Sequence, residues 1–177
     1  MEYGALYFYT ATINQGHDLI RRYDFYNLIT GSLSWLHQKK LIRVYGFVIM
    51  PNHIHFIWQM LQKNGKESPA ASFMKYTAHY FEKHLLNHNL PDLEKYQVSW
   101  RSRKYNFWQP EPHWFLLFKE RTIIQKLNYI HKNPVQKKWN LVNDPVDYPY
   151  SSFCFYETGV NRFDFLNHYK DFDDHKH

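Results

Sequence analysis

The order of strand-forming and helix-forming segments is the feature that most limits the fold. Runs of β-branched and aromatic residues predict strands at 5–13, 41–49, 53–61 and 113–118. Apolar residues at helical spacing predict helices at about 24–40, 68–86 and 120–133. The order β-α-β-β-α-β-α predicts an α+β fold of the ferredoxin-like, split βαβ kind. In this fold an antiparallel sheet carries helices on one face, here followed by a further C-terminal helix and a tail.

Local signals mark the helix ends. Asp24 is expected to cap the first helix, and Ser68, followed by Pro69, the second. Pro134 is expected to end the third. The polar and basic stretch 87–106 is expected to be irregular.

Length and composition favour one globular domain. The 177 residues are 44% hydrophobic, enough for a core, so we expect a single domain over 1–177 with a peripheral tail from about 154 to 177. The only cysteine, Cys154, excludes an intrachain disulfide and a cysteine-based zinc finger, and is expected to be buried. No apolar run approaches the ~20 residues that span a bilayer, and the first residues lack a signal-peptide pattern. We therefore expect a cytoplasmic protein with no membrane partner.

The charge balance favours a nucleic-acid partner. Lys and Arg total 22 against 16 Asp and Glu, a net charge of +6, and 20% of the residues are aromatic. Such a chain suits phosphates and unpaired bases. Aromatic residues are also ordinary core material, so composition alone does not decide this.

His53-Ile54-His55 is the first group with chemical potential. On a strand, residues i and i+2 point to the same face, so both imidazoles project together. Two neutral imidazoles can chelate a divalent metal. Since the chain has 12 His, the alternative is two histidines on a solvated strand face.

Tyr129 and Asn133 form the second group. They are four residues apart on the predicted helix 120–133 and so share one face. Tyr129 lies about 160° around the helix from Leu127, which belongs to the apolar stripe. This places the phenol and the amide away from the core. The alternative is an exposed tyrosine, or one packed against the tail.

Together the two groups suggest a device for phosphate chemistry. A metal held by His53, His55 and the Asn133 amide keeps open positions that can polarise a phosphate oxygen. The Tyr129 phenol can then attack phosphorus and form a phosphotyrosine. A nitrogen and oxygen ligand set without sulfur favours Mg²⁺ or Mn²⁺, and zinc also fits the ligand types.

Four sequence blocks resemble a known family. Residues 45–57 (YGFVIMPNHIHFI) resemble the MPNHxH signature of Y1 transposases, which belong to the IS200/IS605-like superfamily of HUH single-stranded DNA nucleases. Residues 129–135 (YIHKNPV) resemble the YIHxNPV block of the REP-associated tyrosine transposase branch. Residues 107–109 (FWQ) and 147–152 (DYPYSS) resemble two further blocks, in the family's order. The likeness spans roughly residues 5–152.

The resemblance implies roles for the matched residues. His53 and His55 match the metal ligands, Tyr129 the nucleophile, and Asn133 the third ligand, which is Gln in the insertion-sequence branch. It implies a metal-dependent, transposase-like strand transferase that cleaves single-stranded DNA near hairpins through a 5′-phosphotyrosine, leaving a free 3′-OH. The DNA would be a REP-like or transposon-end hairpin, the protein would associate with the nucleoid when bound to it, and the enzyme would be a monomer or a homodimer. One departure is 136–142 (QKKWNLV), which lacks the family's small Ala-Gly pair.

Basic residues beside aromatic ones are candidates for DNA binding. One group lies in the polar stretch and just after it, where cations would follow phosphates and rings would stack on bases: Arg101, Arg103, Lys104 and Trp108. The alternative is a solvated basic loop with its aromatic residues turned inward. A second group flanks the end of the third helix: Lys132, Lys137 and Lys138. The tryptophans Trp35, Trp58 and Trp114 are expected to pack in the core.

Two other functions remain open. One is a hairpin-binding module of the same fold without catalysis, which would form no covalent adduct and would ignore chelators. The other is an unrelated ferredoxin-like metal-binding or small-molecule enzyme, which would have no affinity for single-stranded DNA.

Overall fold

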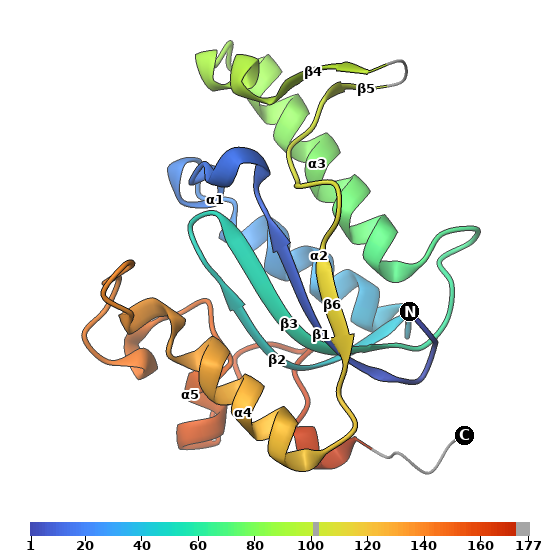
Figure 1. The fold of residues 1–177 in the computed structure, drawn as a ribbon, viewed down its shortest axis with the longest axis vertical. Coiled ribbons are helices and arrows are strands. Elements are labelled where there is room, and N and C mark those ends of the chain that lie inside the picture. Colours follow the sequence, from blue (N-terminus) through green and yellow to red (C-terminus); the bar gives the residue numbers. More distant parts are fainter. Residues whose placement is uncertain (101–102, 173–177) are drawn as a thin grey trace.

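The main sheet has four strands in the order β2-β3-β1-β6, and each neighbouring pair is antiparallel. The computed structural model describes residues 1–100 and 103–172, and Figure 1 shows their arrangement. The strands of this sheet are β1 (Leu6–Thr12), β2 (Ile42–Ile49), β3 (His53–Met60) and β6 (His113–Leu116). The helices are α1 (Leu19–Arg22), α2 (Tyr26–Gln38), α3 (Pro69–Asn87), α4 (Glu120–His131) and α5 (Phe153–Thr158). The predicted α+β fold and its element order are confirmed.

Alternate residues of the strands build two different faces. Tyr9 of β1 and Trp58 of β3 pack with α2 and α3 in the larger core. Phe8 and Ile57, their neighbours in sequence, pack in a second core with α4. In Figure 1, α4 lies in front of the sheet and α2 behind it. The period of two along a strand thus assigns each residue to one face.

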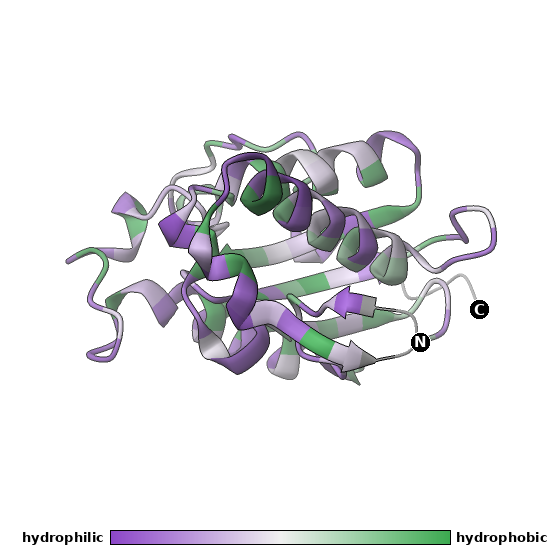
Figure 2. Ribbon diagram, turned by 90° about the horizontal axis from the view of Figure 1, so that it is seen from above, coloured by the Kyte–Doolittle hydropathy of each residue, from purple (hydrophilic) through white to green (hydrophobic). Residues whose placement is uncertain are grey.

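Hydropathy follows this layering. In Figure 2 the strands of the main sheet are largely hydrophobic, whereas the helices mix hydrophobic and hydrophilic residues along their length. Trp58 is fully buried as predicted, but Trp35 and Trp114 are about half exposed, so their assignment to the core was wrong. Within the described ranges, no helix has the length and apolar character needed to cross a bilayer.

The helix starts follow the local signals in one case of two. The Ser68 hydroxyl accepts a hydrogen bond from the Ala71 N–H at 3.2 Å and caps α3, as predicted. The prediction for Asp24 was wrong, because α2 begins after Phe25 with no side-chain cap. Asp24 has a φ of 53° in the tight turn between α1 and α2, where the Phe25 N–H bonds to the Ile20 carbonyl.

The stretch 87–106 is more ordered than predicted. It holds a 3-10 segment, Pro91–Tyr96, and a hairpin of β4 (Gln97–Trp100) and β5 (Arg103–Tyr105). Asp92 anchors the start of this region. Its buried carboxylate accepts a hydrogen bond from the Tyr23 hydroxyl at 2.8 Å and lies 2.6 Å from Arg22.

The C-terminal segment also departs from the prediction. Beyond α5, Phe165 and Leu166 are buried in the larger core. The prediction of a peripheral tail from about residue 154 was therefore wrong for this part of the chain. Leu166 forms a parallel bridge to Val44, and the Asn167 N–H donates to the Val44 carbonyl at 2.8 Å. The open edge of β2 explains this, because its unpaired backbone groups need partners.

Two of the family-like blocks are structural. In the 107–109 block, the Gln109 N–H donates to the Thr12 carbonyl at 2.8 Å, which extends the pairing of β1. In the 147–152 block, the Tyr148 hydroxyl donates to the Ile49 carbonyl at 2.7 Å, and Ser151 forms a bridge to Val48 on the free edge of β2. These two blocks therefore extend the backbone pairing at β1 and β2. The other two blocks carry the histidine pair and Tyr129.

Gly46 sets how closely α4 approaches the sheet. It lies at a bulge in β2, where the register with β3 shifts. A Cβ at this position would lie 2.5 Å from Leu127 Cδ2 and 3.2 Å from Ile130 Cδ1. Only glycine leaves room for α4 as it packs here, and α4 carries Tyr129.

Candidate active site

The two histidines of β3 project from the same face of the sheet, as the strand period predicts. Their ring centroids are 4.8 Å apart. His55 is buried and its ring stacks on Phe8 at 5.4 Å, whereas His53 is partly exposed near the end of the strand. The pair thus extends from the second core, at His55, to the protein surface, at His53.

Hydrogen bonds orient both rings. The Thr10 hydroxyl lies 2.7 Å from His55 Nδ1, and the Asn52 Oδ1 lies 2.8 Å from His53 Nδ1. The Asn52 amide nitrogen donates to the Gly16 carbonyl at 2.6 Å, which turns its oxygen toward the ring. Because an amide oxygen only accepts, His53 Nδ1 carries the proton and Nε2 presents its lone pair.

Both imidazoles are neutral at pH 7. Burial lowers the pKa of His53 to about 4, against the opposing effect of a hydrogen bond with the Asn133 side chain. Burial lowers the pKa of His55 to about 3, and the charges of His53 and Lys126 lower it further. His55 Nε2 is buried and has no hydrogen-bond partner among the described residues. A neutral imidazole with an unpaired nitrogen is the form that binds a metal.

Tyr129 and Asn133 reach the histidines from the end of α4. The Tyr129 ring is 44% exposed, and its centroid lies 5.3 Å from that of His55. Asn133 is buried, and its Nδ2 donates to the Tyr129 carbonyl at 3.0 Å. The four residues predicted for the site, from two segments more than 70 positions apart, therefore lie together.

The donor set fits a divalent metal. It offers imidazole nitrogens from His53 and His55 and the amide oxygen of Asn133, which is compatible with Mg²⁺, Mn²⁺ or Zn²⁺. The unpaired Nε2 of His55 is the atom that most needs a partner. In the described part of the chain, no three His, Cys, Asp or Glu side chains gather, and the third candidate donor beside the two histidines is the Asn133 amide.

Sequence reasoning missed two residues at this site. The Lys126 amine lies 5.5 Å from the Tyr129 ring centroid, and its place three residues before Tyr129 on α4 was a usable signal. Trp139 packs on His53 with ring centroids 5.4 Å apart. It stands in the stretch that lacks the family's small pair, and the chain turns beside it at Asn140, with φ 45°.

The buried position of Trp108 does not fit its predicted role in stacking on a base. It is buried among Phe73 and Phe81, and its Nε1 donates to the Thr77 hydroxyl at 3.0 Å. Phe107 is buried as well, so both aromatic residues turn inward, as the alternative held. A ring held in the core has no face free for a base.

Two of the basic residues of this stretch, Arg103 and Lys104, lie on β5. Lys104 is exposed, and its amine lies 5.4 Å from the Tyr105 ring centroid. Arg103 begins β5, and Arg101 lies outside the described residues. DNA binding by these residues stays a prediction.

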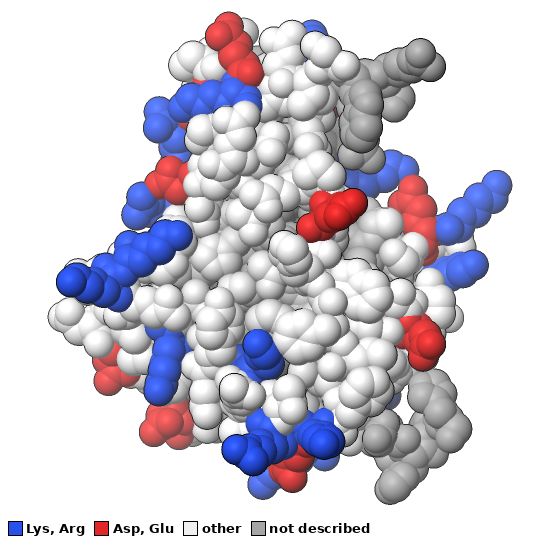
Figure 3. Space-filling view, viewed as in Figure 1, with Lys and Arg blue, Asp and Glu red and all other residues white. Residues whose placement is uncertain are grey.

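Three lysines surround the end of α4, as predicted. Lys132, Lys137 and Lys138 are exposed, and the Lys138 amine lies 5.1 Å from the Trp139 ring centroid. The charge of Lys138 helps to lower the pKa of His53, so it acts on the site itself. Figure 3 shows the Lys and Arg side chains mostly around the rim of this face, with a mainly uncharged area between them.

His131, the histidine between Tyr129 and Asn133, has a structural position. Its Nε2 lies 2.7 Å from the Ser152 hydroxyl, which in turn donates to the Phe47 carbonyl. Burial lowers the pKa of His131 to about 4. It therefore ties the end of α4 to β2 as a neutral ring.

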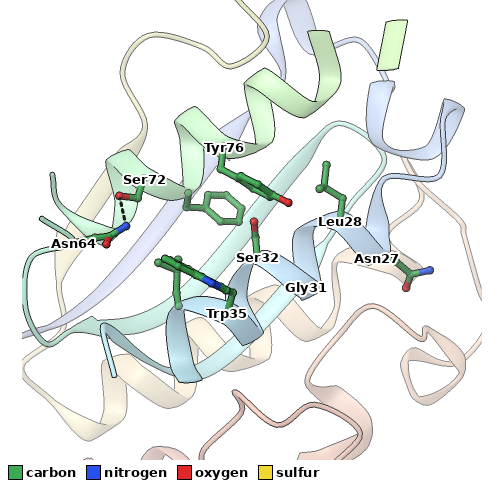
Figure 4. A pocket seen from close by; sticks show the side chains of 10 residues that line it. Asn27, Leu28, Gly31, Ser32, Trp35, Asn64, Ser72 and Tyr76 are labelled. Carbon is green, nitrogen blue, oxygen red and sulfur yellow. Dashed lines mark hydrogen bonds between the residues drawn. The ribbon is translucent and has the colours of Figure 1, made fainter. Parts of the chain in front are cut away.

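A groove lies on the opposite side of the sheet, between α2 and α3. This groove of about 630 Å³ is mainly apolar, and Figure 4 shows Trp35 and Tyr76 beside it. The Asn64 and Ser72 side chains at one end are hydrogen-bonded to each other at 3.1 Å. None of its lining residues is a His, Cys, Asp or Glu, so the histidine face is the better candidate for chemistry.

Comparison with known proteins supports the fold. No family model matches the chain, and no curated protein matches it. A solved structure described as a REP-associated tyrosine transposase bound to a REP hairpin does match, over 99% of this chain and 91% of that one. The chain has the fold of that transposase. The TM-score is 0.61 and the sequence identity is 20%, so the likeness concerns architecture.

Proposed function

We propose that this protein is a metal-dependent tyrosine transposase of the REP-associated kind, which cleaves and rejoins single-stranded DNA near a hairpin. The observation that carries the proposal is the convergence of His53, His55, Tyr129 and Asn133 around an unpaired buried imidazole nitrogen. The sequence blocks that contain these residues resemble that family, and the shared fold agrees with it.

In this proposal His53, His55 and Asn133 hold one Mg²⁺ or Mn²⁺. When bound, the ion supplies positive charge that polarises a phosphate oxygen and favours loss of the nearby phenolic proton. Thr10 and Asn52 form hydrogen bonds with the Nδ1 atoms of the two rings and orient them, and burial keeps both rings neutral. The protein's own part is therefore to orient three donors before the DNA arrives.

The Tyr129 oxygen is the nucleophile. It gives up its proton, attacks the phosphorus of a phosphodiester, and forms a new bond to it. The bond from phosphorus to the 3′ oxygen breaks, and that oxygen takes up a proton to become a free 3′-OH. The 5′ end stays attached to Tyr129 until a 3′-OH attacks in the reverse sense, so the ends rejoin without hydrolysis.

The DNA partner is inferred from charge and from the related fold. The solved neighbour was bound to a REP hairpin, and we extend a hairpin with single-stranded flanks to this chain. Exposed lysines beside the site suit its phosphates: Lys132, Lys137 and Lys138. Because Tyr129 lies against His55 of the same chain, one protomer has a complete set, which favours action as a monomer over a shared site in a homodimer.

The test is covalent capture. The protein is incubated with a hairpin carrying single-stranded flanks, with Mn²⁺ or Mg²⁺, and a protein–DNA adduct is resolved on a denaturing gel. We expect an adduct from the wild type, none from Tyr129→Phe, and an unchanged yield from Tyr76→Phe, an exposed tyrosine beside the groove between α2 and α3.

Two outcomes would overturn the proposal. An adduct that persists in Tyr129→Phe would exclude Tyr129 as the nucleophile. Hairpin binding without any adduct, equal with and without chelator, would instead identify a binding module that lacks catalysis.

A further inference from the structure

A row of three rings leads from the site to the edge of the sheet. His55 on β3 stacks on Phe8 of β1 at 5.4 Å, and Phe8 stacks on Phe115 of β6 at 5.2 Å. The interplanar angles are 27° and 28°, so Phe8 is stacked, with a moderate tilt, on the ring at each side of it. Phe115 is 40% exposed on the edge strand and ends the row at the solvent.

Lys126 lies directly above this row. Its amine is 5.0 Å from the Phe8 centroid, 4.9 Å from the Phe115 centroid and 5.5 Å from the Tyr129 centroid. Within the described ranges, none of the ion pairs involves Lys126. Its amine therefore faces aromatic rings and not a carboxylate, and ring faces attract a cation weakly compared with an anion.

The Lys126 amine and the exposed Phe115 ring lie on the same side of the sheet as Tyr129. Tyr129 and Lys126 are three residues apart on α4 and so lie on the same side of the helix. A strand that presents its phosphate to Tyr129 and crosses the edge of β6 passes Lys126 and then Phe115. The charge of Lys126 is also felt at His55, which agrees with its position next to the metal ligands.

We propose that Phe115 and Lys126 form a subsite for the unpaired nucleotide next to the cleaved phosphodiester. The Lys126 amine contacts a phosphate oxygen, and the exposed face of Phe115 stacks on the base. This inference rests on the proposed function for its DNA partner, and it adds a binding site that neither the family-like blocks nor the basic residues predicted from the sequence contain.

The neighbouring strand residue provides a matched control. Trp114 is 46% exposed, similar to Phe115, but points to the opposite face, where its ring meets Tyr7 at 5.5 Å. A general loss of aromatic surface or damage to β6 would affect both positions. A subsite on the Tyr129 side depends on Phe115 alone.

The experiment measures binding, with no need for catalysis. Fluorescence anisotropy in chelator gives the dissociation constant for a hairpin with a single-stranded extension and for the same hairpin with blunt ends. We expect Phe115→Leu to weaken binding of the extended hairpin about tenfold, as for one lost base–aromatic stack, and to leave the blunt hairpin unaffected. Trp114→Leu is expected to bind both as the wild type does.

Lys126 is tested by its salt dependence and by rescue. For the extended hairpin, Lys126→Gln should reduce the slope of log K against log salt by about 0.7, the value for one phosphate contact with a single strand. Lys126→Arg should restore most of the slope, whereas a purely structural lysine would change neither. Thermal unfolding of each variant shows that the fold is kept.

The outcomes separate this inference from the proposed function. The subsite is refuted if Phe115→Leu and Lys126→Gln bind the extended hairpin as tightly as the wild type does. It is also refuted if Trp114→Leu weakens this binding as much as Phe115→Leu does. Both results hold even when the wild type forms an adduct. If the binding losses occur as expected but the wild type forms no adduct, the subsite stands and the catalytic proposal fails.

Discussion

The two faces of the main sheet use alternate residues of the same strands, yet they differ in how they are covered. One face lies under α2 and α3, helices of 13 and 19 residues. The other lies largely under α4, which has 12 residues. Two long helices cover most of the first face, whereas the second leaves His53 and Tyr129 partly exposed at the end of α4.

Unpaired polar atoms alone do not distinguish the faces. Among the described residues, the Tyr9 hydroxyl and Trp58 Nε1, on the α2 and α3 side, are buried without a hydrogen-bond partner, as is His55 Nε2 on the α4 side. The groove of about 630 Å³ also lies on the first side. On the α4 side, a second imidazole, an amide and an exposed phenol lie beside His55, whose Nε2 is the unpaired atom. Convergence of reactive groups with access to solvent therefore marks the site better than hollow volume does.

The largest expected effect comes from the unpaired imidazole. Because metal polarisation contributes several kcal/mol, His55→Ala should lower the rate of adduct formation by about a thousandfold or more. His37 on α2 also has a buried, unpaired ring nitrogen, and His37→Ala should keep the wild-type rate. Gel quantification over time measures both rates, and a comparable loss in His37→Ala would remove the contrast between the faces.

The hydrogen bonds that orient the two rings come next. Asn52→Ala and Thr10→Val remove the partners of His53 and His55 Nδ1, and each should weaken metal affinity by about 10- to 100-fold. Titration of Mn²⁺ by calorimetry gives these affinities. Thr30→Val on α2 serves as the control, since its hydroxyl bonds only within its own helix, to the Asn27 carbonyl. Unchanged affinity in Asn52→Ala would show that packing alone fixes the His53 ring.

Acid should destabilise the end of α4 through His131. The folded pKa of about 4 lies below the ordinary value of 6.5, so the unfolded state binds the proton more readily. Stability is then complete above pH 6.5 and falls as the pH drops toward 4. From pH 7 to 5 the loss due to His131 should be about 2 kcal/mol. Urea unfolding at the two pH values measures it, and His131→Gln should show a smaller difference; an equal one would assign the acid sensitivity to other groups.

The smallest effects should come from substitution of two glycines. Gly46 lies against α4, and Gly31 lies within α2. Gly46→Ala crowds Leu127 and Ile130, and should lower the free energy of unfolding by about 1 kcal/mol and slow adduct formation by moving α4. Gly31→Ala on α2 meets no atom within 4 Å and should raise stability by roughly 0.5–1 kcal/mol, with an unchanged adduct rate. Urea midpoints test both signs. Equal shifts would mean that α4 is no more closely packed than α2.

Local periodicity explains what was predictable. The period of two puts His53 and His55 on one side of a strand wherever that strand lies. The spacing of four does the same for Tyr129 and Asn133 on a helix. Ser68 caps α3 because its hydroxyl reaches an N–H only three residues away. Each of these predictions depends on bonds within a few residues.

The errors share a cause in long-range pairing. Trp108 turns inward because its segment pairs with the end of β1, which its own neighbours do not reveal. Asp24 fails to cap α2 because α1 and α2 meet in a tight turn that puts it at positive φ. The tail joins the core because β2 has a free edge to pair with.

The sequence by itself determined the order of the elements and which side chains share a face, since both follow from backbone geometry over a few residues. It also supplied the chemical identity of the site, two imidazoles, an amide and a phenol. Only the tertiary structure decided that these groups meet, because α4 approaches β2 through the space that Gly46 leaves. It alone placed Phe115 beside them, since the pairing of β6 with β1 joins segments about 100 residues apart.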